Sequence, residues 1–470
     1  MVLDKIILVL DNVALIYMGM ICTVFFTFII SAALEFNKKE RAKSINEIFE
    51  FDNPIDYTPV SLLVPSYNEE LTICDTIDSL LCSEYSEYEI IVISDGSTDN
   101  SVNLIKDRYN LKKIYKPMNK SIETKEVLNV YKGTYKDRAI TLIDKENGGK
   151  ADALNVGINY SKYPLFVAID ADSVLEKESI KKIVTPFMKN RKTVAVGGNI
   201  KISNHLIIEN GVVTDINKPK KLIVSFQVIE YLRAFLANRI TWDKLNMNLI
   251  ISGAFGAFNK KTVIDIGGYK SNTVGEDMEL VMRIHKYFLK NKEEYYIAFS
   301  PDAICYTQAP DTLKGLKTQR RRWQIGLIQS MTIHKNMFLE KKWFLAKIYF
   351  LVFEMITPII ELLGFLIVIL SFLFKIINFK FLLVYFFMII IYGFAISLTS
   401  IMLEIYAFKQ NIRTNVILKL VFLSLFESIG YRQLISIYRI SAFIGYRKYK
   451  NKWGTIKRNK NRKNEDELIA

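Results

Sequence analysis

The sequence predicts an α/β domain with a mostly parallel sheet, carried between membrane-spanning helices. In the middle of the chain, short apolar or β-branched runs alternate with helical patterns, which is typical of a parallel sheet covered by helices. On either side lie long, nearly uncharged stretches, each about long enough to cross a bilayer. The 470 residues allow two or more domains.

The composition favours anionic partners. The chain carries 63 Lys and Arg against 48 Asp and Glu, a formal charge of +15, and 50% of its residues are hydrophobic. Such a balance suits nucleic acid, an anionic membrane surface or phosphorylated substrates. Because the basic charge gathers beside apolar segments and no nucleic-acid module is recognisable, we do not expect nucleic acid as a partner. The four cysteines show no metal-ligand spacing, which argues against a zinc site or a disulfide framework.

The N-terminal segment, residues 1–35, is predicted to be a retained transmembrane helix. It is followed by Glu35 and the basic run NKKERAK rather than by a small-residue cleavage site. This positive charge should stay in the cytoplasm, which places the N-terminus outside and the central domain inside. Residues 36–57 are predicted to be a linker.

The C-terminal region, residues 344–446, is expected to hold two spans and a bent helix pair. The spans 344–374 and 381–407 return the chain to the cytoplasm. The basic tail, residues 447–470, should also stay in the cytoplasm. One simple further crossing would place this tail on the outer side of the membrane. A re-entrant or interfacial pair bent near Gly430 resolves this, and a fourth plain span is the alternative.

The central domain is predicted to comprise residues 58–310, and residues 311–343 an amphipathic interfacial connector. Polar, chemically capable residues follow each expected strand, and ligands of parallel sheets bind beyond the C-terminal strand ends. The expected strands are 60–65, 89–94, 139–144 and 164–170, separated by helices near 71–82, 99–108 and 150–161.

Two carboxylates follow the last of these strands. Asp170 and Asp172 are two residues apart, so along a strand their side chains would face the same side. Carboxylate oxygens suit Mg²⁺ or Mn²⁺, which usually takes few protein ligands in addition to substrate phosphates. The alternative is a turn in which Asp172 or Ser173 caps the next helix.

Two more segments carry candidate chemistry. In ENGGKADALN (146–155), two glycines and Lys150 precede a helix, so bare N–H groups, the helix N-terminus and an ammonium would form an anion site. An ordinary helix start with a solvated lysine is the alternative. In VGEDMELVMRIH (274–285), Glu276 and Asp277 begin a helix. These acids either complement the helix dipole or provide a general base.

Three further motifs allow both a structural and a functional interpretation. PSYNEE (65–70) and SDGSTDN (94–100) are ordinary turns, or they recognise a nucleoside, with Asp95 accepting hydrogen bonds from its base. QRRRWQIGL (319–327) is an interfacial anchor, or a site where an arginine neutralises a diphosphate and a sugar stacks on Trp323.

These motifs in this order resemble the family-2 glycosyltransferases. They are most similar to the processive membrane-embedded branch, which includes cellulose, hyaluronan, chitin and poly-N-acetylglucosamine synthases. Motifs carry the likeness over roughly residues 58–330, and the rest of the chain resembles the family in the arrangement of its apolar segments. QRRRW fits the QxxRW signature of processive members. It implies a GT-A nucleotide-sugar-binding domain inserted between one N-terminal and two or more C-terminal transmembrane helices.

The resemblance also implies a role for each candidate residue. Asp95 would bind the uracil end of a UDP-sugar with Tyr67 and Glu69, and Lys150 would lie near the diphosphate. The catalytic base would be Asp277, in GED where cellulose synthases have TED. The pair Asp170 and Asp172 would hold Mg²⁺ or Mn²⁺, with Asp172 the more direct contact. The acceptor and diphosphate site would comprise Ser252, Gly253, Gln319, Arg322 and Trp323.

The implied function is an inverting, processive polymerisation of a UDP-sugar, preferably UDP-N-acetylglucosamine, into a β-linked exopolysaccharide of the kind found in biofilms. The product would cross the cell membrane from a cytosolic catalytic domain. Expected partners are the donor, the growing polysaccharide or a lipid acceptor, membrane lipids, and an accessory or regulatory subunit. The alternatives are a cellulose-type UDP-glucose polymerase, transfer of one sugar to a lipid, and an inactive scaffold or export partner.

Two acidic residues within the first C-terminal span fit this function. Glu354 and Glu361 lie seven residues apart, on one helix face, and ionisable residues in a span usually face a partner or a polar path. We expect them either to line a channel for the polysaccharide or to form charge pairs with Arg432 or Arg439.

Overall fold

The computed structural model describes residues 2–46, 58–204, 206–209, 212–217, 219–234, 238–408 and 413–450. The chain forms two compact units. The helical unit comprises Met1–Asn46, Lys218–Thr241 and Asp311–Ile456, and the sheet unit comprises Glu47–Asn217, Trp242–Pro310 and Lys457–Ala470. The predicted domain of residues 58–310 is therefore interrupted by a segment of the helical unit, which contains the apolar helix Leu222–Leu232.

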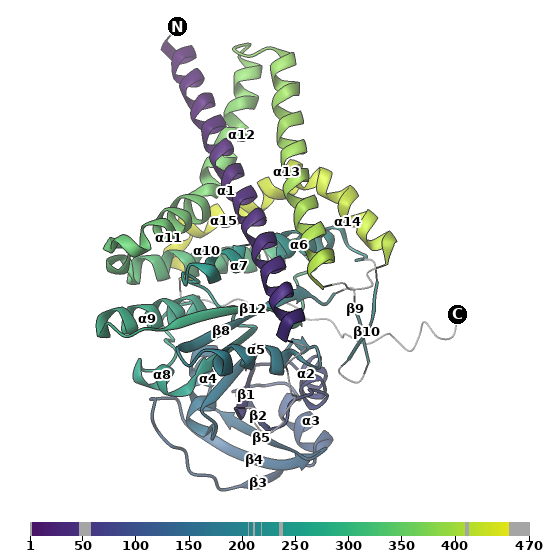
Figure 1. Ribbon diagram of the computed structural model, residues 1–470, viewed down its shortest axis with the longest axis vertical. Coiled ribbons are helices and arrows are strands. Elements are labelled where there is room, and N and C mark those ends of the chain that lie inside the picture. Colours follow the sequence, from purple (N-terminus) through teal and green to yellow (C-terminus); the bar gives the residue numbers. More distant parts are fainter. Residues whose placement is uncertain are drawn as a thin grey trace. The chain divides into compact units, whose positions relative to one another are not determined.

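A mixed sheet of ten strands forms the centre of the sheet unit (Figure 1), in the order β3-β4-β5-β2-β1-β6-β11-β8-β12-β7. The strands are β1 Val60–Ser66, β2 Tyr88–Asp95, β3 Lys112–Ile114, β4 Val127–Tyr135, β5 Arg138–Lys145, β6 Leu165–Ile169, β7 Val174–Leu175, β8 Thr193–Ile202, β11 Phe255–Asn259 and β12 Tyr296–Thr307. A separate antiparallel hairpin joins β9 Leu206–Glu209 and β10 Val212–Ile216.

The strand directions bring several loops to one edge of this sheet. Strands β5, β2, β1 and β6 pair in parallel, and β11 runs antiparallel to β6. The C-terminal ends of the four parallel strands and the N-terminal end of β11 therefore lie at the same edge. The four strands expected from the sequence, and their parallel arrangement, are confirmed.

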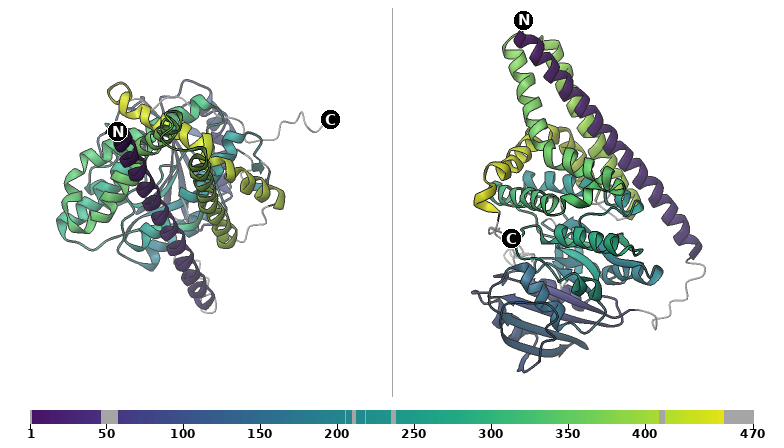
Figure 2. Two further views of the ribbon diagram at one scale, coloured as in Figure 1. Left: turned by 90° about the horizontal axis from the view of Figure 1, so that it is seen from above. Right: turned by 90° about the vertical axis from the view of Figure 1, so that its left-hand side faces the viewer.

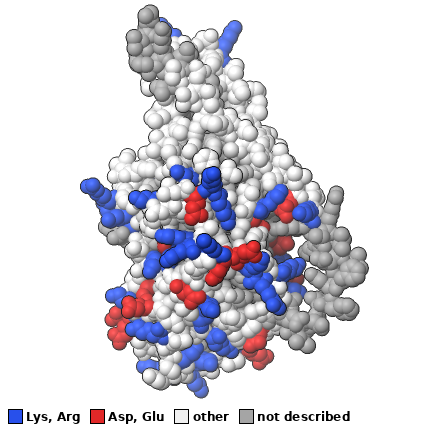
Figure 3. Space-filling view, turned by 60° about the vertical axis from the view of Figure 1, so that its left-hand side comes forward, with Lys and Arg blue, Asp and Glu red and all other residues white. Residues whose placement is uncertain are grey.

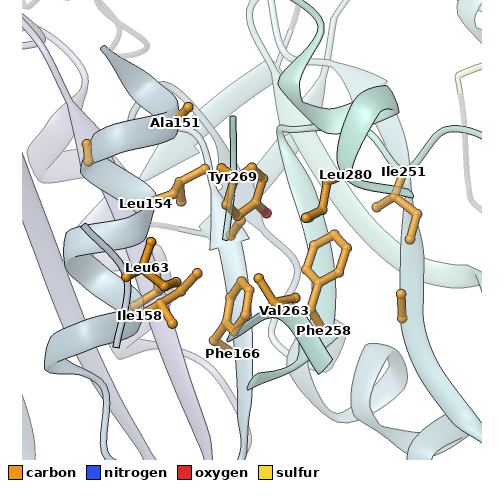
Figure 4. Close-up of a cluster of buried hydrophobic side chains, with 14 of the residues drawn as sticks. Leu63, Ala151, Leu154, Ile158, Phe166, Ile251, Phe258, Val263, Tyr269 and Leu280 are labelled. Carbon is orange, nitrogen blue, oxygen red and sulfur yellow. The ribbon is translucent and has the colours of Figure 1, made fainter. Parts of the chain in front are cut away.

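Helices cover the sheet and close its hydrophobic core (Figure 4). Leu154 and Ile158 of α4 pack in one cluster with Leu63 of β1, Phe166 of β6 and Leu280 of α9. Each fully buried Leu, Ile or Phe side chain contributes about 1.5–3 kcal/mol relative to an exposed one. The helices of this unit are α2 Ile73–Leu81, α3 Ser101–Arg108, α4 Lys150–Tyr160, α5 Ser179–Lys189, α8 Lys260–Asp265 and α9 Glu276–Asn291.

The helical unit begins with a single long helix, α1, which extends to Asn46. The predicted end at residue 35 was too early, because the run NKKERAK consists largely of residues that favour helix. The other helices include α6 Leu222–Leu232, α10 Leu313–Ile333, η3 Lys335–Leu339, η4 Lys341–Trp343, α11 Phe344–Ile348, η5 Tyr349–Ile356, α12 Thr357–Leu373, α13 Phe379–Phe408, α14 Thr414–Phe426, η6 Glu427–Tyr431, α15 Arg432–Ile444 and α16 Tyr446–Tyr449. Helix α7, Asn238–Lys244, includes residues of both units.

Among the described residues, three helical stretches are long and apolar enough to cross a membrane: Lys341–Leu373, Phe379–Tyr406 and Thr414–Ile444. The first two agree with the spans expected from the sequence. Helices α12 and α13 pack against α1 (Figure 2). The upper part of the molecule in Figure 3 is mostly white, with Lys or Arg only near its tip, as contact with lipid requires. These features indicate a membrane protein.

The third stretch is bent where the sequence predicted. Ile429 (φ −119°, ψ 113°) and Gly430 (φ 97°, ψ −63°) leave the helical conformation, and glycine permits the positive φ. The bend separates α14 and α15, which have 13 residues each. Such a helix is about 20 Å long, shorter than the roughly 30 Å hydrocarbon core of a bilayer. The two helices do not run beside the upper parts of α12 and α13 (Figure 1), so a bent pair is favoured over a plain span.

We predict that Gly198→Ala destabilises the sheet unit. A β-carbon at Gly198 would lie 2.1 Å from Cδ1 of Phe255, whose ring is fully buried in β11. Overpacking of this kind costs about 1–3 kcal/mol, so the thermal midpoint of the detergent-solubilised protein should fall by several degrees. The neighbouring Gly197→Ala is the control, because its β-carbon would meet Ile251 at 3.4 Å. Equal midpoints for the two variants would contradict the packing described.

Candidate active site

The loops that follow β1 and β2 are joined by hydrogen bonds. The backbone N–H of Asn68 donates to Ser97 Oγ at 3.2 Å, and the N–H of Thr98 donates to Asn68 Oδ1 at 2.8 Å. Tyr67 and Glu69, predicted to contact the nucleoside, flank Asn68. Tyr67 is 48% exposed, so its ring is accessible to a ligand. Glu69 is half-buried.

Asp95, at the end of β2, is bound to the glycine loop that precedes α4. Its Oδ1 accepts hydrogen bonds from Lys145 Nζ at 2.6 Å and from the N–H of Gly148 at 2.9 Å. Its Oδ2 accepts one from the N–H of Gly149 at 2.7 Å. Both carboxylate oxygens are therefore engaged within the protein, a role that the sequence did not suggest. The predicted contact of Asp95 with a uracil base stays a prediction.

Lys145 is a second residue that sequence reasoning missed. Its side chain has no exposed surface, and its Nζ lies 2.6 Å from Asp95 Oδ1 and 2.7 Å from Asp152 Oδ2. Asp152 also accepts a hydrogen bond from the N–H of Lys125 at 3.1 Å. The ion pairs of this one lysine thus connect the end of β2, the end of β5 and the first turn of α4. The only signal in the sequence is its place directly before the loop ENGGK.

Lys150 lies among carboxylates at the start of α4. Its Nζ pairs with Asp170, donates to the carbonyl of Gly253 at 2.9 Å, and lies 3.9 Å from Glu276 Oε1. Burial would lower the pKa of Lys150, but the charges of Asp170, Glu276 and Asp277 more than offset it, and the net pKa is raised. The side chain therefore stays cationic at neutral pH and suits an anionic ligand.

Asp277 completes this group from α9. Its Oδ2 accepts a hydrogen bond from the N–H of Gly253 at 3.1 Å. A β-carbon at Gly253 would lie 2.9 Å from Lys150 Nζ and 3.6 Å from Asp277 Oδ2, so a larger residue there would displace the Lys150 ammonium. Ser252 precedes it, and the carbonyl of the following Ala254 accepts from the N–H of Asp170 at 3.3 Å. The predicted phosphate lysine, metal-site carboxylate and base are thus brought together around Gly253.

The two carboxylates after β6 differ in exposure. The side chain of Asp170 is 30% exposed. Asp172, predicted as the more direct metal contact, is 2% exposed, and its Oδ1 accepts from Thr307 Oγ1 at 3.3 Å. Within the described ranges, no group of three or more His, Cys, Asp or Glu side chains could hold a metal ion. The carboxylate donors fit a hard divalent cation, whose remaining ligands a substrate phosphate and water would supply.

The predicted residues of QRRRW belong to the helical unit, on α10. Gln319 is 7% exposed, Arg322 is half-buried and Trp323 is 40% exposed. Arg320, which the sequence did not single out, is 2% exposed and lies with its guanidinium carbon 4.3 Å from the centroid of the Trp323 ring.

Of the acidic residues in the first C-terminal span, one has the expected charge partner. Glu354 Oε2 lies 3.4 Å from Arg439 Nη2. Glu361 Oε2 accepts a hydrogen bond from Ser436 Oγ at 3.2 Å. The charge-pair alternative therefore holds for Glu354, while the channel function of both residues stays a prediction.

Comparison with known protein families decides which family the chain belongs to. The model described as "Glycosyl transferase family 2" matches residues 61–207, and that of "Glycosyl transferase family group 2" matches residues 165–408, just over half of the chain. The chain belongs to the family-2 glycosyltransferases. The predicted family and the prediction of an enzyme are thereby confirmed.

Two similar relatives are poly-β-1,6-N-acetyl-D-glucosamine synthases. The one from Staphylococcus epidermidis RP62A is 30% identical over 268 residues, 57% of this chain and 54% of that protein. The one from Staphylococcus aureus COL is 29% identical over 306 residues, 64% of this chain and 62% of that protein. The matched region of this chain thus spans between half and two thirds of these relatives.

A solved structure shares the fold of this glycosyltransferase. It is a mannosyltransferase from Pyrobaculum calidifontis in complex with GDP-mannose and Mn²⁺. The match covers 93% of this chain and 98% of that one, with a TM-score of 0.51 and 16% sequence identity. At this identity the likeness concerns the fold alone, and it confirms the predicted GT-A class.

We predict that Lys145→Met strongly destabilises this glycosyltransferase. The substitution would leave Asp95 and Asp152 buried without their cation, and breaking a buried pair costs about 3–5 kcal/mol. Thermal unfolding should show a large drop in midpoint, or the variant should fail to accumulate. Lys192→Met is the matched control, because Lys192 and its partner Glu294 are 59% and 78% exposed. Similar stability of both variants would refute the structural role of Lys145.

Proposed function

We propose that this enzyme polymerises a UDP-activated sugar into a β-linked polysaccharide and passes the product across the membrane. The group of Lys150, Asp170 and Asp277 around Gly253 carries this proposal, since it combines an anion site, a metal-site carboxylate and a base at one sheet edge. UDP-N-acetylglucosamine is the preferred donor, because both named relatives are poly-β-1,6-N-acetyl-D-glucosamine synthases. The apolar helices α12 and α13 support export.

The reaction would be a single displacement. Asp277 takes the proton of the acceptor hydroxyl, and the oxygen attacks the anomeric carbon of the donor sugar on the side opposite the diphosphate. The bond to the diphosphate breaks as the glycosidic bond forms, and UDP leaves with the bonding electrons. One such step inverts the anomeric centre, so an α-linked donor yields a β-linked product without a covalent enzyme intermediate.

The departing diphosphate requires positive charge. Lys150 supplies a buried ammonium at the N-terminus of α4, where the helix dipole also favours anions. Asp170 and Asp172 would hold Mg²⁺ or Mn²⁺, which would neutralise charge on the diphosphate oxygens. Tyr67, Glu69 and Asp95 are the proposed nucleoside contacts. The proposed acceptor contacts are Ser252, Gly253, Gln319, Arg322 and Trp323.

The membrane orientation follows from charge. The basic run NKKERAK at the C-terminal end of α1 favours a cytosolic sheet unit, where UDP-sugars are available. With α12 and α13 as two crossings and α14 and α15 as a bent interfacial pair, the basic residues after Tyr446 lie on the cytosolic side too. The proposed partners are the donor, the growing chain or a lipid acceptor, membrane lipids and an accessory subunit.

We predict that Asp277→Asn abolishes sugar transfer. Loss of a general base lowers the rate by about 10²–10⁴-fold, while the donor should bind nearly as well. Purified enzyme in nanodiscs would be given Mg²⁺ or Mn²⁺ and each UDP-sugar in turn, and UDP release and product length would be measured. Asp265→Asn, an exposed acid on α8, is the control.

Each outcome of this experiment has a distinct meaning. A long polymer from one donor, absent in Asp277→Asn, would establish the synthase and its sugar. A short lipid-linked product would establish single-sugar transfer instead. Polymer formation by Asp277→Asn at the wild-type rate would refute the base assignment. No UDP release from the intact protein with any donor and either metal would point to a missing accessory subunit or activator, or to the scaffold.

We also predict that UDP release requires a divalent metal. EDTA should abolish release, and Mg²⁺ or Mn²⁺ should restore it. In Asp172→Asn and Asp170→Asn, more metal should be needed for half-maximal rate, because each variant lacks one anionic ligand. Full activity in EDTA, or unchanged metal dependence in both variants, would contradict the metal site.

A further inference from the structure

One carboxylate in the helical unit is shared by three elements. Arg320 Nη2 of α10 donates to Glu230 Oε2 of α6 at 2.7 Å. The hydroxyl of Tyr431, at the end of η6, donates to the same oxygen at 2.7 Å. Burial would lower the pKa of Arg320, but the charge of Glu230 and the hydroxyls of Tyr431 and Tyr231 together outweigh burial and raise it. The triad of Glu230, Arg320 and Tyr431 is therefore a buried ion pair with an added hydrogen bond.

This triad supports an exposed aromatic ring. The guanidinium carbon of Arg320 lies 4.3 Å from the centroid of the Trp323 ring, a cation–π contact. The ring of Tyr231, next to Glu230 in α6, lies 6.1 Å from that of Trp323. Trp323 is nevertheless 40% exposed. A ring held from the protein side and open on the other is suited to stack on a sugar.

The bent helix pair is fixed to the same helix. Arg233, one turn beyond Glu230, pairs with Glu427 at 2.8 Å, and Ser397 of α13 donates to Glu427 at 2.7 Å. Glu427 begins η6 and Tyr431 ends it, so both ends of the bend at Gly430 are bound to residues at the end of α6. A shift of the bend would therefore pull on Glu230 and, through it, on Arg320.

We propose that Glu230, Arg320 and Tyr431 are positioning residues that set the orientation of Trp323 toward the acceptor sugar. This rests on the proposed function, in which the acceptor stacks on Trp323. Loosening the triad frees the Trp323 ring to rotate, which weakens acceptor binding and lets the growing chain dissociate earlier. Donor binding, which depends on the sheet edge around Gly253, is unaffected.

The test uses Tyr431→Phe in the full-length enzyme. This variant loses the hydroxyl but retains the ring, which stacks on Phe226 at 4.9 Å. Tyr438→Phe is the matched control: Tyr438 belongs to the same buried cluster, and its hydroxyl forms no hydrogen bond with any described residue. We expect the acceptor KM to rise on the order of 10-fold in Tyr431→Phe, as for a lost hydrogen bond to a charged group. Mean product length should fall, with the donor KM unchanged.

A second readout does not depend on turnover. The fluorescence of Trp323 is obtained by subtracting the spectrum of the matching Trp323→Phe protein, and its quenching by acrylamide is compared. Quenching should increase in Tyr431→Phe and in Glu230→Gln, and stay at the wild-type level in Tyr438→Phe. A thermal midpoint near that of the wild type shows that Tyr431→Phe is folded.

The two readouts separate the failure of this inference from that of the proposed function. If no donor yields a polymer, the proposed function fails, and quenching alone decides whether the triad holds Trp323. If polymer forms but neither acceptor KM, product length nor quenching differs between Tyr431→Phe and Tyr438→Phe, the triad does not position Trp323. A rise in donor KM without a change for the acceptor would equally overturn the inference.

Discussion

A buried lysine determines the geometry of the sheet edge around Gly253. The side chain of Lys145 is fully buried between Asp95 and Asp152. Asp95 also accepts hydrogen bonds from the N–H groups of Gly148 and Gly149. The loop that leads into α4 is thereby bound to the end of β2. The position of Lys150 beside Gly253 depends on this connection, because Lys150 is the first residue after that loop.

The helical unit relies on the same kind of interaction. A buried ion pair often adds little net stability, since desolvation offsets the attraction, yet it fixes the position of the groups that it joins. Arg320 and Glu230 fix α10 to α6, and Arg233 and Glu427 fix the bend to α6. The pair of Glu354 and Arg439 is more exposed, at 33% and 23%, and its contribution is correspondingly weaker.

Local patterns in the sequence predicted the elements, while the partners of the charged residues required the tertiary structure. The runs that became β1, β2, β5 and β6 are recognisable because buried strands are apolar and polar residues follow them. The bend near Gly430 was predicted because the chain before it and the basic tail after it should both lie in the cytoplasm. In contrast, Asp95 and Lys145 are 50 residues apart, and Arg320 and Glu230 are 90 apart. No periodicity links such positions, so the roles of Lys145 and Arg320 were missed.

Burying the charged groups around α6 costs desolvation free energy, and the fixed helix register that their pairs impose accounts for their presence. Charged groups among apolar, membrane-associated helices are unfavourable unless they are paired, and apolar residues of similar volume would often be as stable. Apolar packing alone, however, permits helices to slide and rotate, whereas the hydrogen-bonded pairs of Glu230 and Glu427 fix one register. At Gly430 the bend lacks the backbone hydrogen bonds of a straight helix. The side chain of Gln433 bonds to the N–H of Gly430 and to the carbonyl of Ser428 instead, and Glu427 and Tyr431 fix the two ends of the bend to residues at the end of α6.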